Sequence, residues 1–205
     1  NNNPHGSLHY HHTVDGKNYI MSNDCFWRLY TFREGCAFNE CSPDVLEAVG
    51  TAFGDFQLML QDFDSSTLVE TIPDFHNTRK RYNHLLEIVK KDPKGRVKKV
   101  SKDLELVELL KDVSLRVCDW NEQGKFPVRT THNDTKVNNA LLEKNTLNPV
   151  LVIDLDTVMP GLIVHDFGDA IRFGANKAKE DEKDLSKVKL SLPKFYAFAR
   201  GFIGK

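Results

Sequence analysis

Residues 131–139 read Thr-His-Asn-Asp-Thr-Lys-Val-Asn-Asn, and residues 150–156 read Val-Leu-Val-Ile-Asp-Leu-Asp. The first stretch lies between two short β-forming segments, and the second ends an apolar run that follows a polar turn at 144–146. These segments predict a hairpin, which returns the chain to nearly its starting point. We therefore expect Asp154 to lie close to Asp134, although twenty residues separate them.

Four side chains in this hairpin carry complementary chemistry. Asp134 and Asp154 supply carboxylates, Asn139 supplies an amide oxygen, and Lys136 supplies an ammonium group. Oxygen ligands of this kind suit Mg²⁺, which takes few protein ligands and keeps several waters. The sequence therefore predicts a small cavity that can hold a magnesium ion.

The spacing of these residues matches a known pattern. His132, Asp134 and Asn139 fit H-x-D-x-x-x-x-N, the catalytic loop of the protein-kinase-like fold, and the apolar run ending in Asp154 resembles its metal-binding segment. Asn133 replaces the arginine of protein kinases, and Leu155 follows the metal aspartate where they have Phe-Gly. The chain instead resembles the aminoglycoside phosphotransferase and choline kinase superfamily.

Several further motifs narrow the resemblance within that superfamily. The chain is similar to the N-acetylhexosamine 1-kinase branch over about residues 19–204, most closely at 53–57, 72–78, 131–139, 153–161 and 166–172. Members of that branch phosphorylate the anomeric hydroxyl of GlcNAc or GalNAc with ATP and Mg²⁺. The resemblance therefore implies a sugar substrate and a nucleotide as the partners of this chain.

The resemblance implies a chemical role for each residue of the loop. Asp134 would accept the proton of the attacking hydroxyl, and Lys136 would offset charge on the transferred phosphoryl group. Asn139 and Asp154 would hold Mg²⁺ across the nucleotide phosphates. The first pair is therefore expected to be catalytic and the second pair to bind the metal.

Other residues are expected to support the site or to bind its ligands. His132 and Asp166 would hold the catalytic loop in place. Arg172 would bind sugar or phosphate, although a salt bridge to a nearby aspartate explains it equally well. The hinge that would face adenine, or that would simply connect two lobes, comprises Phe32, Arg33 and Glu34.

The order of elements predicts an α+β chain with two unequal lobes. Residues 1–35 are expected to be a remnant of the N-lobe strands with the hinge, including a strand over 25–32. Residues 36–205 are expected to form a mainly helical C-lobe that carries the catalytic hairpin. Helices are predicted to begin near Ser42, Asn77, Ser101 and Ser191 and after Gly161, from apolar residues at three- and four-residue steps.

Composition excludes several classes of protein. The 205 residues carry 28 Lys and Arg against 29 Asp and Glu, so the near-neutral chain is not expected to bind nucleic acid. No apolar run reaches the roughly 20 residues that span a bilayer, so no membrane association is expected. The four cysteines form no C-x-x-C pair, and they indicate reduced thiols and a cytoplasmic location.

A phosphate-covering G-x-G-x-x-G motif is not found before the hinge. We therefore expect this chain to be a kinase core that lacks both ends, that is inactive by itself, and that self-associates through the exposed N-lobe strands. Two alternatives remain open. One is a catalytically inactive, kinase-like binding module. The other is a sulfatase-type hydrolase suggested by Cys41-Ser42-Pro43, although Val45 stands where that motif needs arginine and Ser42-Pro43 also fits a helix start.

Overall fold

The computed structural model describes residues 8–39 and 41–204, and these residues form two compact units. Unit 1 combines the chain up to Val69 with the chain from Arg129 onward, and unit 2 comprises Glu70–Val128. The mixture of short strands and helices confirms the predicted α+β class. The expected boundary between residues 35 and 36 stays a prediction, and residues 1–7 of that expected N-lobe lie outside the described residues.

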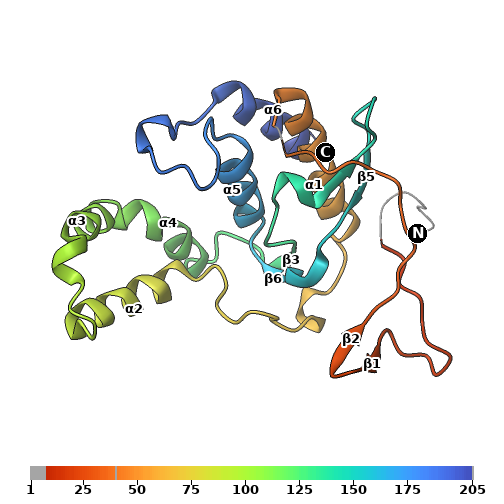
Figure 1. Cartoon of the computed structure of the whole chain (residues 1–205), viewed down its shortest axis with the longest axis horizontal. Coiled ribbons are helices and arrows are strands. Elements are labelled where there is room, and N and C mark those ends of the chain that lie inside the picture. The colour runs from red at the N-terminus through yellow and green to blue at the C-terminus, as the bar shows by residue number, and fades with distance from the viewer. Residues whose placement is uncertain (1–7, 40, 205) are drawn as a thin grey trace. The chain divides into compact units, whose positions relative to one another are not determined.

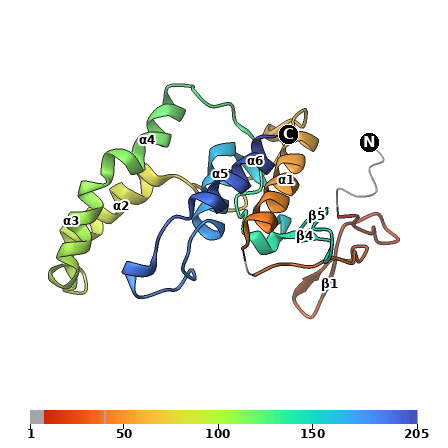
Figure 2. The same cartoon turned by 90° about the horizontal axis from the view of Figure 1, so that it is seen from above.

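Two helices form the centre of unit 1 (Figure 1). Helix α1 (Pro43–Met59) begins as predicted, because the Ser42 side chain accepts a hydrogen bond from the Val45 amide at 3.2 Å and Pro43 takes the first turn. Helix α6 (Leu192–Ile203) lies against it in both views (Figure 2). A Cβ on Gly50 would meet the backbone of α6 at 2.4 Å, so this glycine permits the close approach of the two helices.

A two-stranded hairpin packs on α1. Strands β4 (Ala140–Leu142) and β5 (Pro149–Val152) pair antiparallel, with Leu141 opposite Leu151. The predicted hairpin is therefore confirmed. The hydrophobic core of unit 1 comprises Val45, Leu46, Val49, Ala52, Phe53, Phe56, Val137, Ala140, Leu142, Val152, Ala170, Phe198 and Phe202.

A second strand pair closes the loop region. Strand β3 (Arg129–Thr131) pairs antiparallel with β6 (Met159–Gly161), a pairing that the sequence reasoning did not foresee. Helix α5 (Ile163–Gly174) follows β6 directly. The strands on either side of the predicted catalytic loop, β3 and β4, are therefore each paired with another strand.

The N-terminal part of unit 1 is mostly extended. Strands β1 (Ile20–Ser22) and β2 (Cys25–Trp27) form a hairpin whose turn places Asn23 and Asp24 at φ of 52° and 58°. The predicted strand over 25–32 is wrong beyond Trp27. Beyond it, residues 28–31 instead run beside 9–11, with backbone hydrogen bonds of 2.8 and 2.9 Å and a bridge between Tyr10 and Tyr30.

Unit 2 consists of three helices, which are α2 (Thr78–Lys91), α3 (Ser101–Leu109) and α4 (Lys111–Glu122). The helix predicted to begin near Ser101 does so, but it ends at Leu110, where ψ is 1° and the chain leaves the helical range before α4 begins. Leu115 is the one buried residue of this unit. Across the described parts of both units, no helix has the length and apolar character that crossing a membrane requires.

Candidate active site

The predicted catalytic loop, residues 131–139, connects β3 to β4. Seven of the ten residues from 130 to 139 are buried, while Asp134, Lys136 and Asn138 are partly exposed. From Asp134 to Val137 partly exposed and buried side chains alternate, before a 3-10 turn over Val137–Asn139. The loop therefore presents the Asp134 carboxylate and the Lys136 ammonium on one side and is anchored by the other.

Asp166, at 1% exposure on α5, is the main anchor of the loop. Its carboxylate accepts hydrogen bonds from the amides of His132 at 2.9 Å and Asn133 at 2.7 Å, and from the Gln57 side chain at 2.8 Å. Burial raises the pKa of Asp166 above its ordinary value, although the hydrogen bonds from the two backbone amides lower it in part. In addition, the Thr135 hydroxyl donates to the Asp166 carbonyl oxygen at 2.5 Å. These contacts fix the backbone that carries Asp134.

His132 joins the loop to the predicted metal-binding segment, which ends at Asp154. Its Nε2 lies 2.9 Å from the Ile153 carbonyl oxygen, and its Nδ1 lies 3.3 Å from the Asp134 amide. Both contacts are satisfied when Nε2 carries the proton and Nδ1 accepts, so the geometry assigns the neutral Nε2–H tautomer. The ring is fully buried and lies edge-on to Phe53 and Phe56, at centroid distances of 5.4 and 5.7 Å.

Asp134, Lys136 and Asn139 converge. The Lys136 Nζ lies 3.1 Å from the Asp134 carboxylate. The Asn139 Nδ2 donates to the Asp134 carbonyl oxygen at 2.8 Å and lies 3.3 Å from its carboxylate. The hydrogen bond to Asp134 raises the pKa of Lys136, so the lysine carries its charge at neutral pH. A carboxylate and a fixed ammonium therefore share one small surface.

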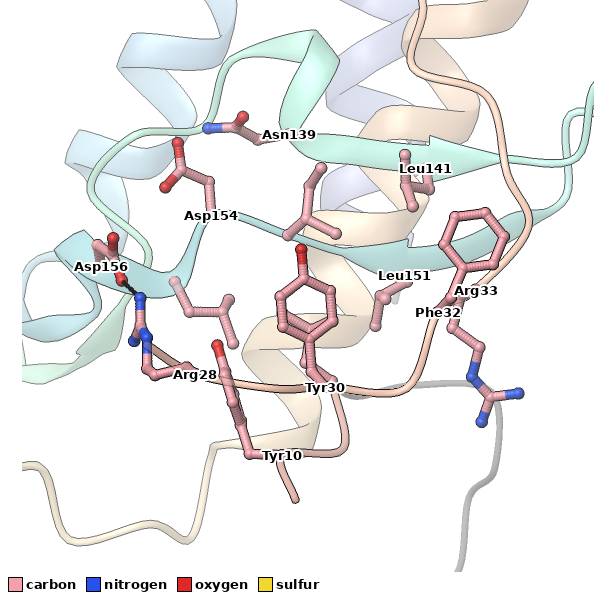
Figure 3. Close-up of a pocket in the computed structure, with 13 residues that line it drawn as sticks. Tyr10, Arg28, Tyr30, Phe32, Arg33, Asn139, Leu141, Leu151, Asp154 and Asp156 are labelled. Atoms are coloured by element: carbon pink, nitrogen blue, oxygen red, sulfur yellow. Dashed lines mark hydrogen bonds and ion pairs between the residues drawn. The ribbon is translucent and has the colours of Figure 1, made fainter. Parts of the chain in front are cut away.

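Asp154 follows β5 in a left-handed conformation, with φ of 61° and ψ of 57°. This conformation is energetically unfavourable for a residue other than glycine, and such residues are found more often at functional sites. The Ile153 amide donates to the Asn139 carbonyl oxygen at 2.8 Å, and Figure 3 shows the Asn139 and Asp154 side chains close together at one end of a pocket. The structure thus brings Asn139 and Asp154 together and links them to Asp134.

These two side chains fit Mg²⁺ in part. With Nδ2 committed to Asp134, the amide oxygen is the Asn139 atom left for a cation, and Asp154 adds a carboxylate. Within residues 8–39 and 41–204, no cluster of three or more His, Cys, Asp or Glu side chains could hold a metal. Magnesium held here would therefore need water and phosphate oxygens as its other ligands, which is its usual preference.

The pocket has a volume of about 470 Å³. Phe32 and Arg33, two of the predicted hinge residues, line it, whereas Glu34 does not. Just after the predicted hinge, Cys36 and Leu142 of β4 are joined by two backbone hydrogen bonds, at 2.8 and 3.0 Å. The other lining residues are Leu8, Tyr10, Arg28, Tyr30, Asn139, Leu141, Leu151, Ile153, Asp154, Leu155 and Asp156.

Arg172 does not line this pocket. Its guanidinium is paired with Asp169 at 2.9 Å and with Glu180 at 2.8 Å, and these partners raise its pKa. The salt bridge that the sequence offered as an alternative is therefore present. A role in substrate binding stays a prediction.

Sequence reasoning missed four residues of this region. Gln57 was detectable, because it is a polar residue on the apolar face of α1. Thr157, whose hydroxyl donates to the His132 carbonyl oxygen at 2.7 Å, carries no pattern that marks it. Arg28 and Asp156 form an ion pair of 2.7 Å at the pocket, and 128 positions separate them, so only the fold reveals it.

Comparison with known proteins gives this geometry a context. An aminoglycoside phosphotransferase from Alicyclobacillus acidocaldarius has a TM-score of 0.58 at 14% identity, with 95% of this chain and 58% of that chain covered. An ethanolamine kinase from Plasmodium vivax has a TM-score of 0.53 at 16% identity, with 91% and 53% covered. An ADP-bound aminoglycoside phosphotransferase has a TM-score of 0.51 at 15% identity, with 98% and 61% covered.

The chain thus spans 53% to 61% of the length of these three proteins. At such identities the likeness shows the fold, and it confirms the predicted protein-kinase-like fold of the aminoglycoside phosphotransferase type over the part that the chain covers. The model of the phosphotransferase enzyme family matches residues 7–186, which is most of the chain. The chain therefore belongs to the phosphotransferase enzyme family.

Proposed function

We propose that this chain carries the catalytic core of a small-molecule kinase, which transfers the γ-phosphoryl group of Mg²⁺-ATP to a hydroxyl group. The observation that carries the proposal is the junction at Asn139. Its side-chain amide donates a hydrogen bond to Asp134, and its carbonyl oxygen accepts one from the amide of Ile153, the residue before Asp154. Asn139 therefore links the proposed proton acceptor, Asp134, to the second proposed metal ligand, Asp154.

The chemistry follows from these positions. Asp134 would orient the acceptor hydroxyl and take its proton as the oxygen attacks phosphorus. Lys136, held 3.1 Å from that carboxylate, would offset negative charge on the transferred group. Mg²⁺, held by Asn139 and Asp154, would supply charge neutralisation at the nucleotide phosphates. The protein contributes positioning and charge, which is what phosphoryl transfer requires.

The nucleotide belongs in the pocket beside the hinge. Phe32, Leu141 and Leu151 offer apolar surface for a flat base, and Asn139 and Asp154 stand at the other end (Figure 3). Aromatic and aliphatic walls with a few polar groups are typical of ligand pockets of this size. An ADP-bound relative with the same fold supports nucleotide use.

We further propose that the acceptor is the anomeric hydroxyl of an N-acetylhexosamine. This finer assignment rests on the resemblance of residues 131–139, 153–161 and 166–172 to the N-acetylhexosamine 1-kinase branch. The test incubates the purified chain with Mg²⁺-ATP and GlcNAc or GalNAc, and measures sugar 1-phosphate. We expect formation well below the usual kinase range of about 1–100 s⁻¹, because this chain contains no Gly-rich phosphate-covering motif.

Two controls make that slow signal informative. Asp134→Asn sets the background, and product above it must come from the proposed site. The 1-O-methyl glycoside of GlcNAc keeps every other hydroxyl but blocks the anomeric one, so it is expected to give no product. Phosphorylation of the methyl glycoside would overturn the anomeric assignment, and equal product from the wild type and Asp134→Asn would overturn the proposed function.

A further inference from the structure

The pocket next to the hinge is chemically asymmetric. In the N-terminal part of the chain, Arg28, Tyr30 and Phe32 line the pocket, whereas residues 29 and 31 do not. This alternation is the one expected of an extended segment, in which every second side chain faces the same side. In Figure 3, Phe32 and Arg33 lie at one end, and Arg28 lies at the other end with Asp154 and Asp156. A ligand with a flat ring and a charged tail therefore has one favoured direction in this pocket.

Arg28 is held at the charged end by two contacts. Its Nη2 donates to the Asp156 carboxylate at 2.7 Å, and its guanidinium lies over the Tyr10 ring, 5.6 Å from the centroid. Tyr10 is itself fixed edge-on to Tyr30, at a centroid distance of 5.9 Å. A guanidinium has five N–H donors, and this ion pair uses one nitrogen, so donors remain for a further acceptor.

The position of Arg28 suits an anion that also binds magnesium. Asp156, its partner, is two residues from Asp154, the proposed metal ligand. The second cation of this wall, Arg33, lies at the hinge end, so it is far from the metal end in Figure 3. Arginine donates to phosphate oxygens through a planar fork, which makes it a common phosphate ligand.

We infer that Arg28 contacts the phosphate chain of the bound nucleotide, and that Asp156 holds the guanidinium in position for that contact. The inference rests on the proposed function, since it assigns a further ligand of the proposed nucleotide. It also assigns a cation to the phosphates from the segment before the hinge, where the sequence contains no phosphate-covering glycine motif.

The test measures binding of ADP and of adenosine to the full chain by isothermal titration calorimetry, with Mg²⁺ present. The two ligands share the base and the ribose, so their difference reports the phosphate contacts. We expect Arg28→Gln to weaken ADP binding about tenfold or more, because charge-assisted hydrogen bonds are lost, and to leave adenosine binding unchanged. Unchanged adenosine binding also shows that the variant has kept its pocket.

Two matched variants separate a phosphate contact from a structural role. Arg33→Gln removes the same charge at the hinge end, and we expect it to change ADP and adenosine binding by equal factors. Asp156→Asn breaks the same ion pair but keeps Arg28, so we expect it to weaken ADP binding by about threefold, which is less than the loss in Arg28→Gln. Unchanged ADP binding in Asp156→Asn would remove Asp156 from the positioning role, and a loss equal to that in Arg28→Gln would show that only the ion pair matters.

The remaining outcomes are also decisive. ADP binding that is insensitive to Arg28→Gln overturns the inference and leaves the proposed function standing. A parallel loss of ADP and adenosine binding in Arg28→Gln also overturns it, because the arginine then only supports the wall. If the wild-type chain binds neither ligand, the proposed function fails and the inference falls with it.

Discussion

The catalytic loop and unit 2 are stabilised in opposite ways. Seven of ten residues from 130 to 139 are buried, and the amides of His132 and Asn133 donate to the buried Asp166 carboxylate, which also accepts from Gln57. Unit 2, by contrast, buries only Leu115 among its 59 residues from Glu70 to Val128. Its helices are joined by exposed ion pairs such as Arg79 with Asp119 and Glu122.

This difference between the loop and unit 2 indicates which part of the chain has a rigid structure. Buried hydrogen-bond networks fix side chains, because any displacement leaves a polar group unpaired in a low-dielectric interior. Exposed ion pairs contribute little and are screened by salt. Precise geometry is therefore confined to the loop that carries Asp134, and unit 2 is expected to open at a lower free energy.

The largest effect is expected where the rigid loop meets its proposed chemistry. Asp134→Asn keeps the shape of the side chain but removes the proton acceptor, so phosphoryl transfer should fall by about 10²–10⁴-fold. Thermal unfolding should change little, because the carboxylate is partly exposed. Steady-state assays and calorimetric melting on the same samples check both statements. More than about a tenth of the wild-type rate in the variant would remove Asp134 from this role.

The next effect compares one buried side chain from each unit. Phe198 of α6 is fully buried in the core of unit 1, whereas Leu115 keeps 7% exposure in a unit with little core around it. Phe198→Ala is expected to lower the free energy of unfolding by about 3–5 kcal/mol, and Leu115→Ala by about 2 kcal/mol.

Hydrogen exchange locates these losses. Phe198→Ala should accelerate amide exchange throughout α1 and α6, because it weakens the core of unit 1. Leu115→Ala should accelerate exchange only within residues 70–128. Faster amide exchange in α1 of the Leu115→Ala variant would show that the two units unfold together. It would contradict the proposal that unit 2 opens at a lower free energy than unit 1.

The third effect contrasts two aspartates. Asp166→Ala leaves the His132 and Asn133 amides without their buried acceptor, and we expect a loss of about 3 kcal/mol in unfolding free energy. Asp119→Ala removes an exposed partner of Arg79, which still has Glu122 at 2.9 Å, so the loss should stay below about 1 kcal/mol. Chemical denaturation measures both, and equal losses would contradict the proposed division of stability.

The sequence predicted the parts of the fold that local chemistry determines. The helix starts at Ser42 and Asn77 follow from capping residues, and the antiparallel β4–β5 hairpin follows from a polar turn between apolar runs. The strand expected over 25–32 failed because β-forming residues need a partner strand, and the partner of 28–31 is the distant segment 9–11.

Prediction of the site met the same limit. The motif spacing identified Asp134, Asn139 and Asp154, since they lie on one hairpin and its loop. It could not pair Gln57 with Asp166 or Arg28 with Asp156, because those contacts join elements more than a hundred residues apart. Local pattern predicts which residues carry chemistry, and tertiary packing decides which residues hold them in place.

The smallest expected effect concerns the charge beside Asp134. The hydrogen bond and the charge of Asp134 raise the pKa of Lys136, and Glu180 and Asp169 add to this from further away. Because the folded pKa lies above the ordinary value of about 10.4, the pair's contribution to stability is fully present below that pH. It is lost as the pH rises through the raised pKa, and at this partial exposure it amounts to at most about 1 kcal/mol.

A titration of ¹³C-labelled lysine side chains by NMR measures the pKa of Lys136 directly. Asp134→Asn removes the largest cause and should lower the Lys136 pKa toward the ordinary value, whereas Glu180→Gln should lower it by less. A Lys136 pKa that is the same in Asp134→Asn and the wild type would mean that the ion pair does not persist in solution, and the loop would then be less rigid than its buried contacts imply.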